Sequence, residues 1–274
     1  MQKSKRKRLI ISAVYLAIFL LLALWIRSCT KPKETCSDGI RNQNEKDIDC
    51  GGVCAACKKI EAKYLTIGEA GILDSTIQGQ YDFFGLVANP NNVYGSDNFT
   101  YQIRFKDESG NILAEKKGNS FILPGDKKYI VETNIPSNTR PASVEFTILE
   151  TGWIEFDTYY EKPDIKIVNK SYNEINSGVG FAEAIGLLKN NSPFDFASIK
   201  IKIILRDSNG RIVALNSTEM RTVNSGEERD FRASWPSRFQ GTVTDVEAQP
   251  EVNVFSTDAF AKKYFKTQQF QEYK

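Results

Sequence analysis

Two stretches of the chain, about 100 residues apart, alternate between apolar and polar residues in the pattern of a half-buried β-strand. The first begins at Phe99 and the second at Ile199. One set of side chains is expected to face a hydrophobic core and the other set to face solvent. The core set comprises Phe99, Tyr101, Ile103 and Phe105 in the first stretch and Ile199, Ile201, Ile203 and Leu205 in the second.

The two stretches belong to a longer internal repeat. Asp107 and Gly110 follow the first stretch, and Asp207 and Gly210 follow the second. Asp-x-x-Gly between apolar strands favours a turn, because Asp caps it through its side chain and Gly accepts a positive φ. Further matched pairs are Gly85 with Gly186, Asn89 with Asn190, Gly125 with Gly226 and Ile130 with Phe231. Each copy thus contains five to seven short strands with regular turn signals, which predicts a β-sandwich.

Residues 9–26 form an uncharged apolar stretch of 18 residues, and a helix of that length crosses the hydrocarbon core of a bilayer. Five cations precede it, so the positive-inside rule predicts a cytoplasmic N-terminus and an extracytoplasmic remainder. A cleaved signal peptide has a shorter apolar region that ends in small residues, whereas this stretch ends in Trp25 and Ile26. An uncleaved anchor is therefore favoured, with lipidation at Cys29 as a weaker alternative.

All five cysteines follow directly after this stretch. A segment so short and so rich in turn residues cannot bury a core and needs another source of stability. Because disulfides persist outside the cytoplasm, we expect two disulfides among four of the cysteines, with three pairings open. The four are Cys36, Cys50, Cys54 and Cys57, which leaves Cys29 unpaired or joined to another chain.

Metal binding by the same segment is a weaker alternative. Zinc ligation by four cysteines is disfavoured by the 13-residue gap after Cys36, which is unlike a paired C-x-x-C ribbon. Calcium would find hard oxygen ligands in Asp38, Glu45, Asp47 and Asp49, although their spacing is not that of an EF-hand loop. The default interpretation of these acids is solvated loop residues, so no cofactor is expected.

The cysteine segment resembles a motif of bacterial surface proteins, C-x-D-G-x-x-N-x-x-E-x-D-x-D-C-G-G-x-C-x-x-C. The matching positions are Cys36, Asp38, Gly39, Asn42, Glu45, Asp47, Asp49, Cys50, Gly51, Gly52, Cys54 and Cys57. The resemblance covers 22 residues. It implies an extracytoplasmic setting and no defined activity.

The strand–Asp-x-x-Gly–strand unit of each copy resembles the FxLYD family of small bacterial immunoglobulin-like domains. Residues 103–107 and 203–207 correspond to the stretch that gives the family its name. The resemblance covers roughly 70 to 90 residues of each copy. It implies a sandwich that serves surface display or interaction, not catalysis.

Composition narrows the function further. Histidine is absent, which removes the commonest general base and the commonest metal ligand. The chain contains no nucleotide-binding or serine-hydrolase motif, so we do not expect an enzyme. An extracellular carboxylate-dependent hydrolase is the remaining enzymatic alternative, with Asp82, Glu183 or Asp195 as candidate acids. Lys and Arg alternate with Asp and Glu at a net charge of +2, which predicts solvated strand faces and no nucleic-acid partner.

The expected fold class is mainly β, with one N-terminal transmembrane helix, a small cysteine-rich segment and two tandem immunoglobulin-like β-sandwiches. The boundaries are a basic cytoplasmic tail at 1–8, the helix at 9–26, the cysteine-rich box at 27–58, the first sandwich at 59–156, a linker at 157–163, the second sandwich at 164–256 and a C-terminal tail at 257–274. Placed end to end, two such sandwiches would reach roughly 80 Å.

These features predict a structural or binding protein of the bacterial cell envelope. Residues 9–26 would hold it in the bilayer, and the sandwiches would bind envelope proteins, wall polymer or copies of the same chain. Exposed edge strands are the expected docking sites. An accessory subunit of an envelope assembly or secretion complex is the alternative, in which the anchor helix itself packs against partner helices.

Overall fold

A computed structural model describes residues 14–22, 35–40, 42, 44–45, 49–56 and 61–265. The chain divides into two units, residues 1–61 and residues 62–274, which are treated separately. In the first unit, residues 14–22 are helical. Within the described ranges, no helix has the length and apolar composition needed to cross a bilayer. The remainder of the predicted anchor and the basic tail at 1–8 lie outside the described residues, so the anchor stays a prediction.

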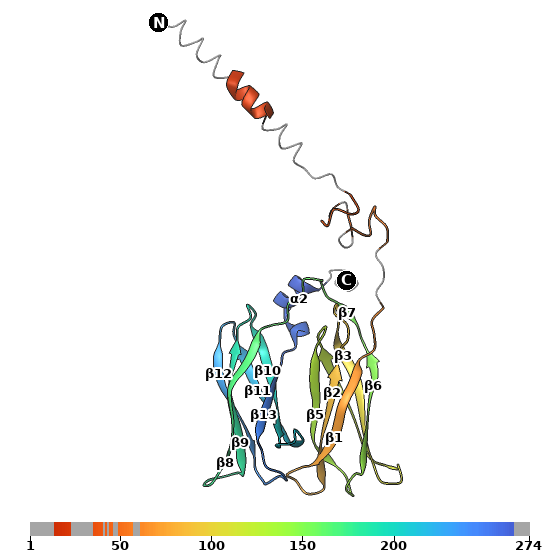
Figure 1. Cartoon of the computed structure of the whole chain (residues 1–274), viewed down its shortest axis with the longest axis vertical. Coiled ribbons are helices and arrows are strands. Elements are labelled where there is room, and N and C mark those ends of the chain that lie inside the picture. The colour runs from red at the N-terminus through yellow and green to blue at the C-terminus, as the bar shows by residue number, and fades with distance from the viewer. Residues whose placement is uncertain are drawn as a thin grey trace. The chain divides into compact units, whose positions relative to one another are not determined.

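The second unit is mainly β, which confirms the expected fold class at this level (Figure 1). The strands of the first copy are β1 (Thr66–Asp74), β2 (Gln80–Ala88), β3 (Tyr94–Lys106), β4 (Ile112–Ile122), β5 (Lys127–Pro136), β6 (Ser143–Thr151) and β7 (Ile154–Glu155). Those of the second are β8 (Ile165–Glu174), β9 (Ala182–Asn190), β10 (Phe196–Arg206), β11 (Ile212–Val223), β12 (Glu228–Trp235) and β13 (Asp245–Glu251). A 3₁₀ helix, η1 (Val254–Ser256), and a short α-helix, α2 (Asp258–Tyr264), follow.

The two copies have the same strand order. In the first, sheet β1-β2-β5 faces sheet β4-β3-β6, and β7 pairs with the start of β3. In the second, sheet β8-β9-β12 faces sheet β11-β10-β13. Replacing each strand of the first copy by the corresponding strand of the second gives the same two sheets. The repeat seen in the sequence is therefore also a repeat of sandwich architecture.

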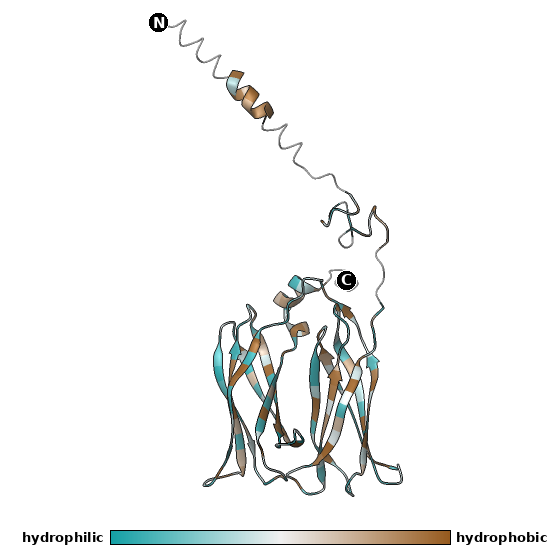
Figure 2. Cartoon of the chain, viewed as in Figure 1, coloured by the Kyte–Doolittle hydropathy of each residue, from teal (hydrophilic) through white to brown (hydrophobic). Residues whose placement is uncertain are grey.

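The predicted core residues are buried. All four of the first stretch, on β3, and all four of the second, on β10, have side chains almost closed to solvent. Each set belongs to the hydrophobic cluster between the two sheets of its own sandwich. Hydrophobic and hydrophilic segments succeed one another along the strands of both sandwiches (Figure 2). The period-two pattern thus identified the core face of each sandwich correctly.

The predicted Asp-x-x-Gly turns are also confirmed. The Asp107 carboxylate accepts the backbone N–H of Asn111 at 2.8 Å, and the equivalent Asp207 carboxylate accepts that of Arg211 at 2.9 Å. Gly110 has a φ of 84° and Gly210 one of 77°, in the region that a residue with a Cβ rarely adopts. Both residue types are needed, because Asp closes the turn through its side chain and Gly adopts the positive φ that reverses the chain.

The matched asparagines form a buried hydrogen-bonding centre in each copy. The Asn190 amide nitrogen donates to the carbonyl oxygens of Phe194 and Asn224 at 2.8 and 2.9 Å. In the first copy, the Asn89 amide nitrogen makes the same two contacts with Tyr94 and Leu123, at 2.7 and 2.9 Å. Each asparagine therefore ties the end of a strand to two backbone carbonyls of neighbouring segments.

The two sandwiches pack side by side, not end to end (Figure 1). The outer face of sheet β1-β2-β5 meets the outer face of sheet β11-β10-β13 in a third hydrophobic cluster. We call this contact the junction; it is formed by Tyr129, Ile204, Ile212 and Leu215, with Leu73, Phe84, Leu86 and Val131 packed against them. The expected reach of two sandwiches in line is therefore wrong.

The junction overturns a second expectation, that the polar positions of these strands are solvated. Ile204 lies on the face of β10 that the alternation assigns to solvent, yet it is 0% exposed. Lys202 on the same face and Lys128 on β5 are each 6% exposed. The reason is that one sandwich covers the outer sheet face of the other, so β10 is buried on both sides.

The segment between the sandwiches is packed against the C-terminal helix. Phe156 is fully buried, and its ring lies 4.7 Å from that of Tyr160 and 4.9 Å from that of Phe265. Phe260 and Tyr264 of α2 extend the same aromatic cluster. The connection and the described part of the predicted tail therefore fix each other in place, and residues 266–274 lie outside the described residues.

The junction can be tested with Ile204→Asp in the full-length protein. A carboxylate at this buried position must become hydrated, so we expect the two sandwiches to part while each keeps its own core. Hydrogen–deuterium exchange should then become at least about tenfold faster for amides of β5 and β11. A loss of about 1.4 kcal/mol in the free energy that protects these amides is enough for a tenfold change.

The matched control is Lys200→Asp, which changes an exposed residue of the same strand face. It should leave the exchange of β5 and β11 unchanged. Equal protection in Ile204→Asp and the wild type would refute the side-by-side arrangement.

Candidate functional site

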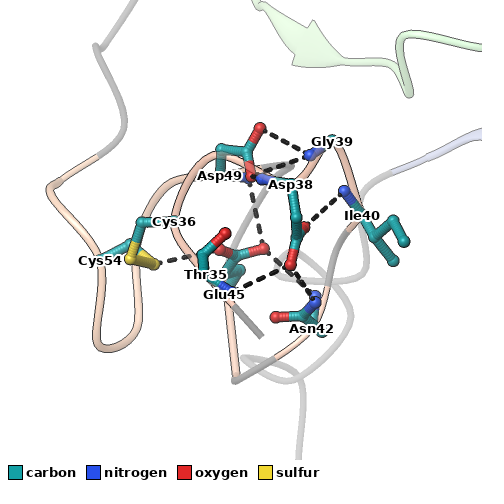
Figure 3. The surroundings of a disulfide bond; sticks show 9 residues. All are labelled: Thr35, Cys36, Asp38, Gly39, Ile40, Asn42, Glu45, Asp49 and Cys54. Atoms are coloured by element: carbon teal, nitrogen blue, oxygen red, sulfur yellow. Dashed lines mark hydrogen bonds between the residues drawn. A yellow bond between two sulfur atoms is a disulfide. The ribbon is translucent and has the colours of Figure 1, made fainter. Parts of the chain in front are cut away.

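The cysteine box is held together by a disulfide between Cys36 and Cys54 (Figure 3). Cys50 is disulfide-bonded as well. Cys57 and Cys29 lie outside the described residues, so the prediction that Cys57 completes a second disulfide and that Cys29 stays outside both is still a prediction. The sequence left the partner of Cys36 open, and the structure pairs it with Cys54.

The acids of the box point into its loops and accept backbone N–H groups (Figure 3). Asp49 accepts the N–H groups of Asp38 and Gly39 at 2.9 and 3.1 Å, across 10 to 11 residues of chain. Asp38 accepts the N–H groups of Thr35 and Ile40 at 3.0 and 2.9 Å. The N–H of Thr35, then the Asn42 side chain, lower the pKa of the Asp38 carboxyl. These carboxylates therefore serve as internal caps, as in Asx turns.

Glu45 is the buried acid of the box. One carboxylate oxygen accepts the N–H groups of Asn42 and Asp49, at 3.2 and 3.3 Å, and the other lies 3.0 Å from Cys54 Sγ. The ligand atoms of Cys36, Glu45 and Cys54 lie within 4.8 Å of one another. A cysteine binds zinc as a thiolate, and the disulfide leaves none at Cys36 or Cys54. The expectation of no cofactor stays a prediction, with calcium and zinc as its weaker alternatives, and Asp47 lies outside the described residues.

The three acids considered for a hydrolase are placed apart, each with its own partner. Asp82 lies on β2 of the first sandwich and accepts the N–H of Asn134 at 2.8 Å. Glu183 is the second residue of β9 in the second sandwich and pairs with Arg232 at 3.4 Å. Asp195 follows the other end of β9 and accepts the N–H of Ser225 at 2.7 Å. These contacts explain all three acids as local structural groups.

The second unit contains a site that the sequence analysis did not predict. A cavity of about 260 Å³ lies between the sandwiches and the connection that joins them. Its lining comprises Phe121, Leu123, Asp126, Lys127, Lys128, Lys162, Pro163, Ile165, Lys202, Gln249, Pro250, Glu251 and Val252. Two buried lysines from different sandwiches thus face the same pocket.

A single carboxylate joins these lysines. Glu251 on β13 pairs with Lys202 at 2.8 Å through one oxygen and with Lys128 through the other. The Lys128 ammonium also donates to the carbonyl of Phe121 at 2.8 Å and to the hydroxyl of Ser120 at 3.0 Å. It lies 3.9 Å from the centre of the Phe121 ring, in a cation–π contact.

Lys202 and Gln249 cover the edge of β5 at Tyr129. The Tyr129 carbonyl accepts a hydrogen bond from Lys202 at 2.6 Å, and the Tyr129 N–H donates to the Gln249 side chain at 3.0 Å. An edge strand normally presents such groups to solvent or to another strand. At this residue, side chains from the second sandwich take the place of a neighbouring strand, so this part of β5 is unsuited to strand addition.

One carboxylate cannot neutralise two buried ammonium groups. Burial is the largest cause that lowers the pKa of Lys202, followed by the nearby charge of Lys200, and together they bring it to about 7. Burial also lowers the pKa of Lys128, and the charge of Lys202 adds to this effect. The direction is physically reasonable because losing one proton makes the Lys–Glu–Lys cluster neutral.

A local signal of this site existed in the sequence. The second copy reads Ile203-Ile204-Leu205 where the first reads Ile103-Arg104-Phe105. An unbroken apolar run in an otherwise alternating strand indicates burial on both faces. The lysines themselves gave no such signal, since Lys at an alternating position is typical of a solvated face.

Comparison with known proteins gives no assignment: no protein-family model matches the chain, and the search of curated proteins found no match. The resemblances to FxLYD domains and to the surface-protein cysteine motif therefore stay predictions.

The role of Asp49 as an internal cap can be tested with Asp49→Ala. Losing this acceptor leaves two N–H groups without a partner and should cost about 1–2 kcal/mol of local stability. We expect dithiothreitol to reduce the Cys36–Cys54 disulfide about 5- to 30-fold faster, measured by mass spectrometry of alkylated peptides.

The control is Val53→Ala, at a residue of the same loop that is 70% exposed. In this variant, dithiothreitol should reduce the Cys36–Cys54 disulfide at the wild-type rate. If Asp49→Ala also does so, the carboxylate does not support the loop.

The lysine cluster predicts a pH-dependent stability. Between pH 7 and the ordinary Lys pKa of 10.5, the unfolded Lys202 holds a proton that the folded one has lost. The unfolded state then binds more protons, so the free energy of unfolding rises as pH rises. The slope is at most about 1.4 kcal/mol per pH unit. Urea denaturation at pH 7 and pH 9.5 measures it.

Lys202→Met should flatten this dependence, whereas Lys170→Met, at an exposed residue of β8, should retain it. A wild-type stability that falls over this range, or an identical slope in Lys202→Met, would argue against a depressed pKa at this lysine.

Proposed function

We propose that this chain is a membrane-anchored, extracytoplasmic structural or binding protein of the bacterial cell envelope. The observation that carries the proposal is the Cys36–Cys54 disulfide. Structural disulfides persist in oxidising compartments and are rare in the cytosol. The apolar stretch at 9–26 and the cations before it supply the anchor and its orientation.

Strand order supports an immunoglobulin-like assignment for both sandwiches. In each, the first, second and fifth strands form one sheet, and the fourth, third and sixth form the other. Immunoglobulin-type sandwiches likewise separate the first, second and fifth strands from the third and sixth, although here the fourth strand pairs with the third. The FxLYD resemblance points to the same class of domain and to roles in display or interaction.

The junction supports a binding role for a rigid pair of sandwiches. Because the apolar faces at the junction are buried against each other, both sandwiches would present their remaining surfaces in one fixed arrangement. Partner proteins would dock by strand addition at an edge such as β4 or β12. These edges are preferred to β5, where Tyr129 already bonds to Gln249 and Lys202.

The compartment is tested on sealed cells. Protease added outside should degrade residues 62–274, and a membrane-impermeant thiol reagent should label Cys36 and Cys54 only after reduction. A protected C-terminal region, with Cys36 and Cys54 unlabelled in sealed cells but reactive without reduction after lysis, would refute the extracytoplasmic proposal.

The binding role is tested by photo-crosslinking from positions on β4 and β12 in intact cells. A defined neighbour is expected, and it should persist when residues 9–26 are replaced by an unrelated apolar helix. Loss of that neighbour on replacement would favour an accessory subunit whose anchor helix makes the contact. Absence of any crosslinked neighbour from either edge would contradict docking at these strands.

A further inference from the structure

The cavity lies beside the junction, and its lining combines seven charged or polar residues with six apolar ones. We infer that it binds a small organic monocarboxylate, whose charged end meets Lys202 and whose apolar body fills the space beside the apolar residues. The inference concerns the second unit alone and is independent of the compartment and the partner proposed above.

The charge of the lining favours an anion. Four lysines face the cavity, and only two carboxylates, Asp126 and Glu251, face it with them. Asp126 is paired with Lys162 at 2.6 Å, and Glu251 is shared between Lys128 and Lys202. One buried positive charge is therefore left over, which a single ligand carboxylate would neutralise.

Lys202 has a donor available for such a ligand. Its ammonium group has three N–H bonds. Within the described part of the chain, hydrogen-bond and ion-pair contacts occupy two of them, with the Tyr129 carbonyl at 2.6 Å and the Glu251 carboxylate at 2.8 Å. Lys128, by contrast, has its three donors directed at Glu251, Phe121 and Ser120. The third donor of Lys202 is the natural anchor for the ligand.

The apolar lining decides between kinds of anion. Leu123, Ile165 and Val252 face the cavity together with the Phe121 ring. An inorganic phosphate would leave these apolar side chains without contacts. Pockets for drug-sized ligands measure roughly 300–1,000 Å³, so a cavity of about 260 Å³ suits a small aromatic or branched aliphatic acid.

A bound carboxylate would also join the sandwiches. The lining residues come from β5 and the turn before it, from the connection at 162–165 and from β10 and β13. A ligand that touches all of these stabilises the folded junction by mass action, because it binds only when both sandwiches are in place.

Affinity should depend on pH through the groups around the ligand. Lys202 interacts with Lys128 and Glu132 from β5, with Glu251 from β13 and with Lys200 on its own strand. Asp126, Lys127 and Lys162 also line the pocket. Because the pKa of Lys202 is about 7, the ammonium form that attracts an anion predominates at pH 6 and is largely lost at pH 8.5.

The test is isothermal titration calorimetry of the full-length protein in detergent with sodium benzoate at pH 6. We expect saturable binding in the millimolar range or tighter, and affinity about tenfold lower at pH 8.5. Benzamide, which has the same ring without the charge, should bind at least about tenfold more weakly, as should inorganic phosphate.

Two variants locate the site. Lys202→Met should weaken benzoate binding at least about tenfold, whereas Lys170→Met should not change it. Ile165→Phe keeps every charge and fills part of the cavity, so it should weaken binding as well. Circular dichroism verifies that each variant is folded. The inference is overturned if the wild type gives no saturable heat with benzoate, or if folded Lys202→Met or Ile165→Phe binds benzoate as the wild type does.

Discussion

Ile204 is buried although its position on β10 points away from the core of its own sandwich. It packs against the outer face of the first sandwich, and removing one such side chain from water contributes about 1.5–3 kcal/mol. The arrangement of residues 62–265 depends on this contact. Once the sheets meet there, Lys202 and Lys128 are enclosed, the edge of β5 is covered at Tyr129, and a cavity forms beside Glu251.

The copies share a fold but differ at the positions that meet. Lys202 and Ile204 of β10 correspond to Gln102 and Arg104 of β3. Arg104 pairs with Glu115 at 2.9 Å, where the second copy has Leu215 in the junction. The two copies thus share one sandwich architecture, and a few outward-facing side chains distinguish the sheet of each that forms the contact.

The sequence was sufficient for the parts of the fold that depend on local rules. Alternation identified the core face of β3 and β10, and the Asp-x-x-Gly signal identified turns whose hydrogen bonds the structure contains. The junction and its lysines depend on which outer faces meet, and period-two alternation carries no information about that second layer. In the cysteine box, the sequence indicated disulfides but could not choose the partner of Cys36, because pairing is set by how the loop closes around Glu45.

The contact between the sandwiches uses a different face from each partner: sheet β1-β2-β5 of one and sheet β11-β10-β13 of the other. A head-to-tail contact of this kind has no built-in end, and repeated between molecules it would generate an open filament. The next contact in such a filament would use the outer faces of sheets β4-β3-β6 and β8-β9-β12. These faces carry charged residues at the positions that are apolar or aromatic in the junction. Arg104 stands in place of Ile204, and Asp230 and Arg232 stand in place of Tyr129 and Val131. Those substitutions limit the series to two sandwiches, so the divergence of the repeat also protects the protein against polymerisation.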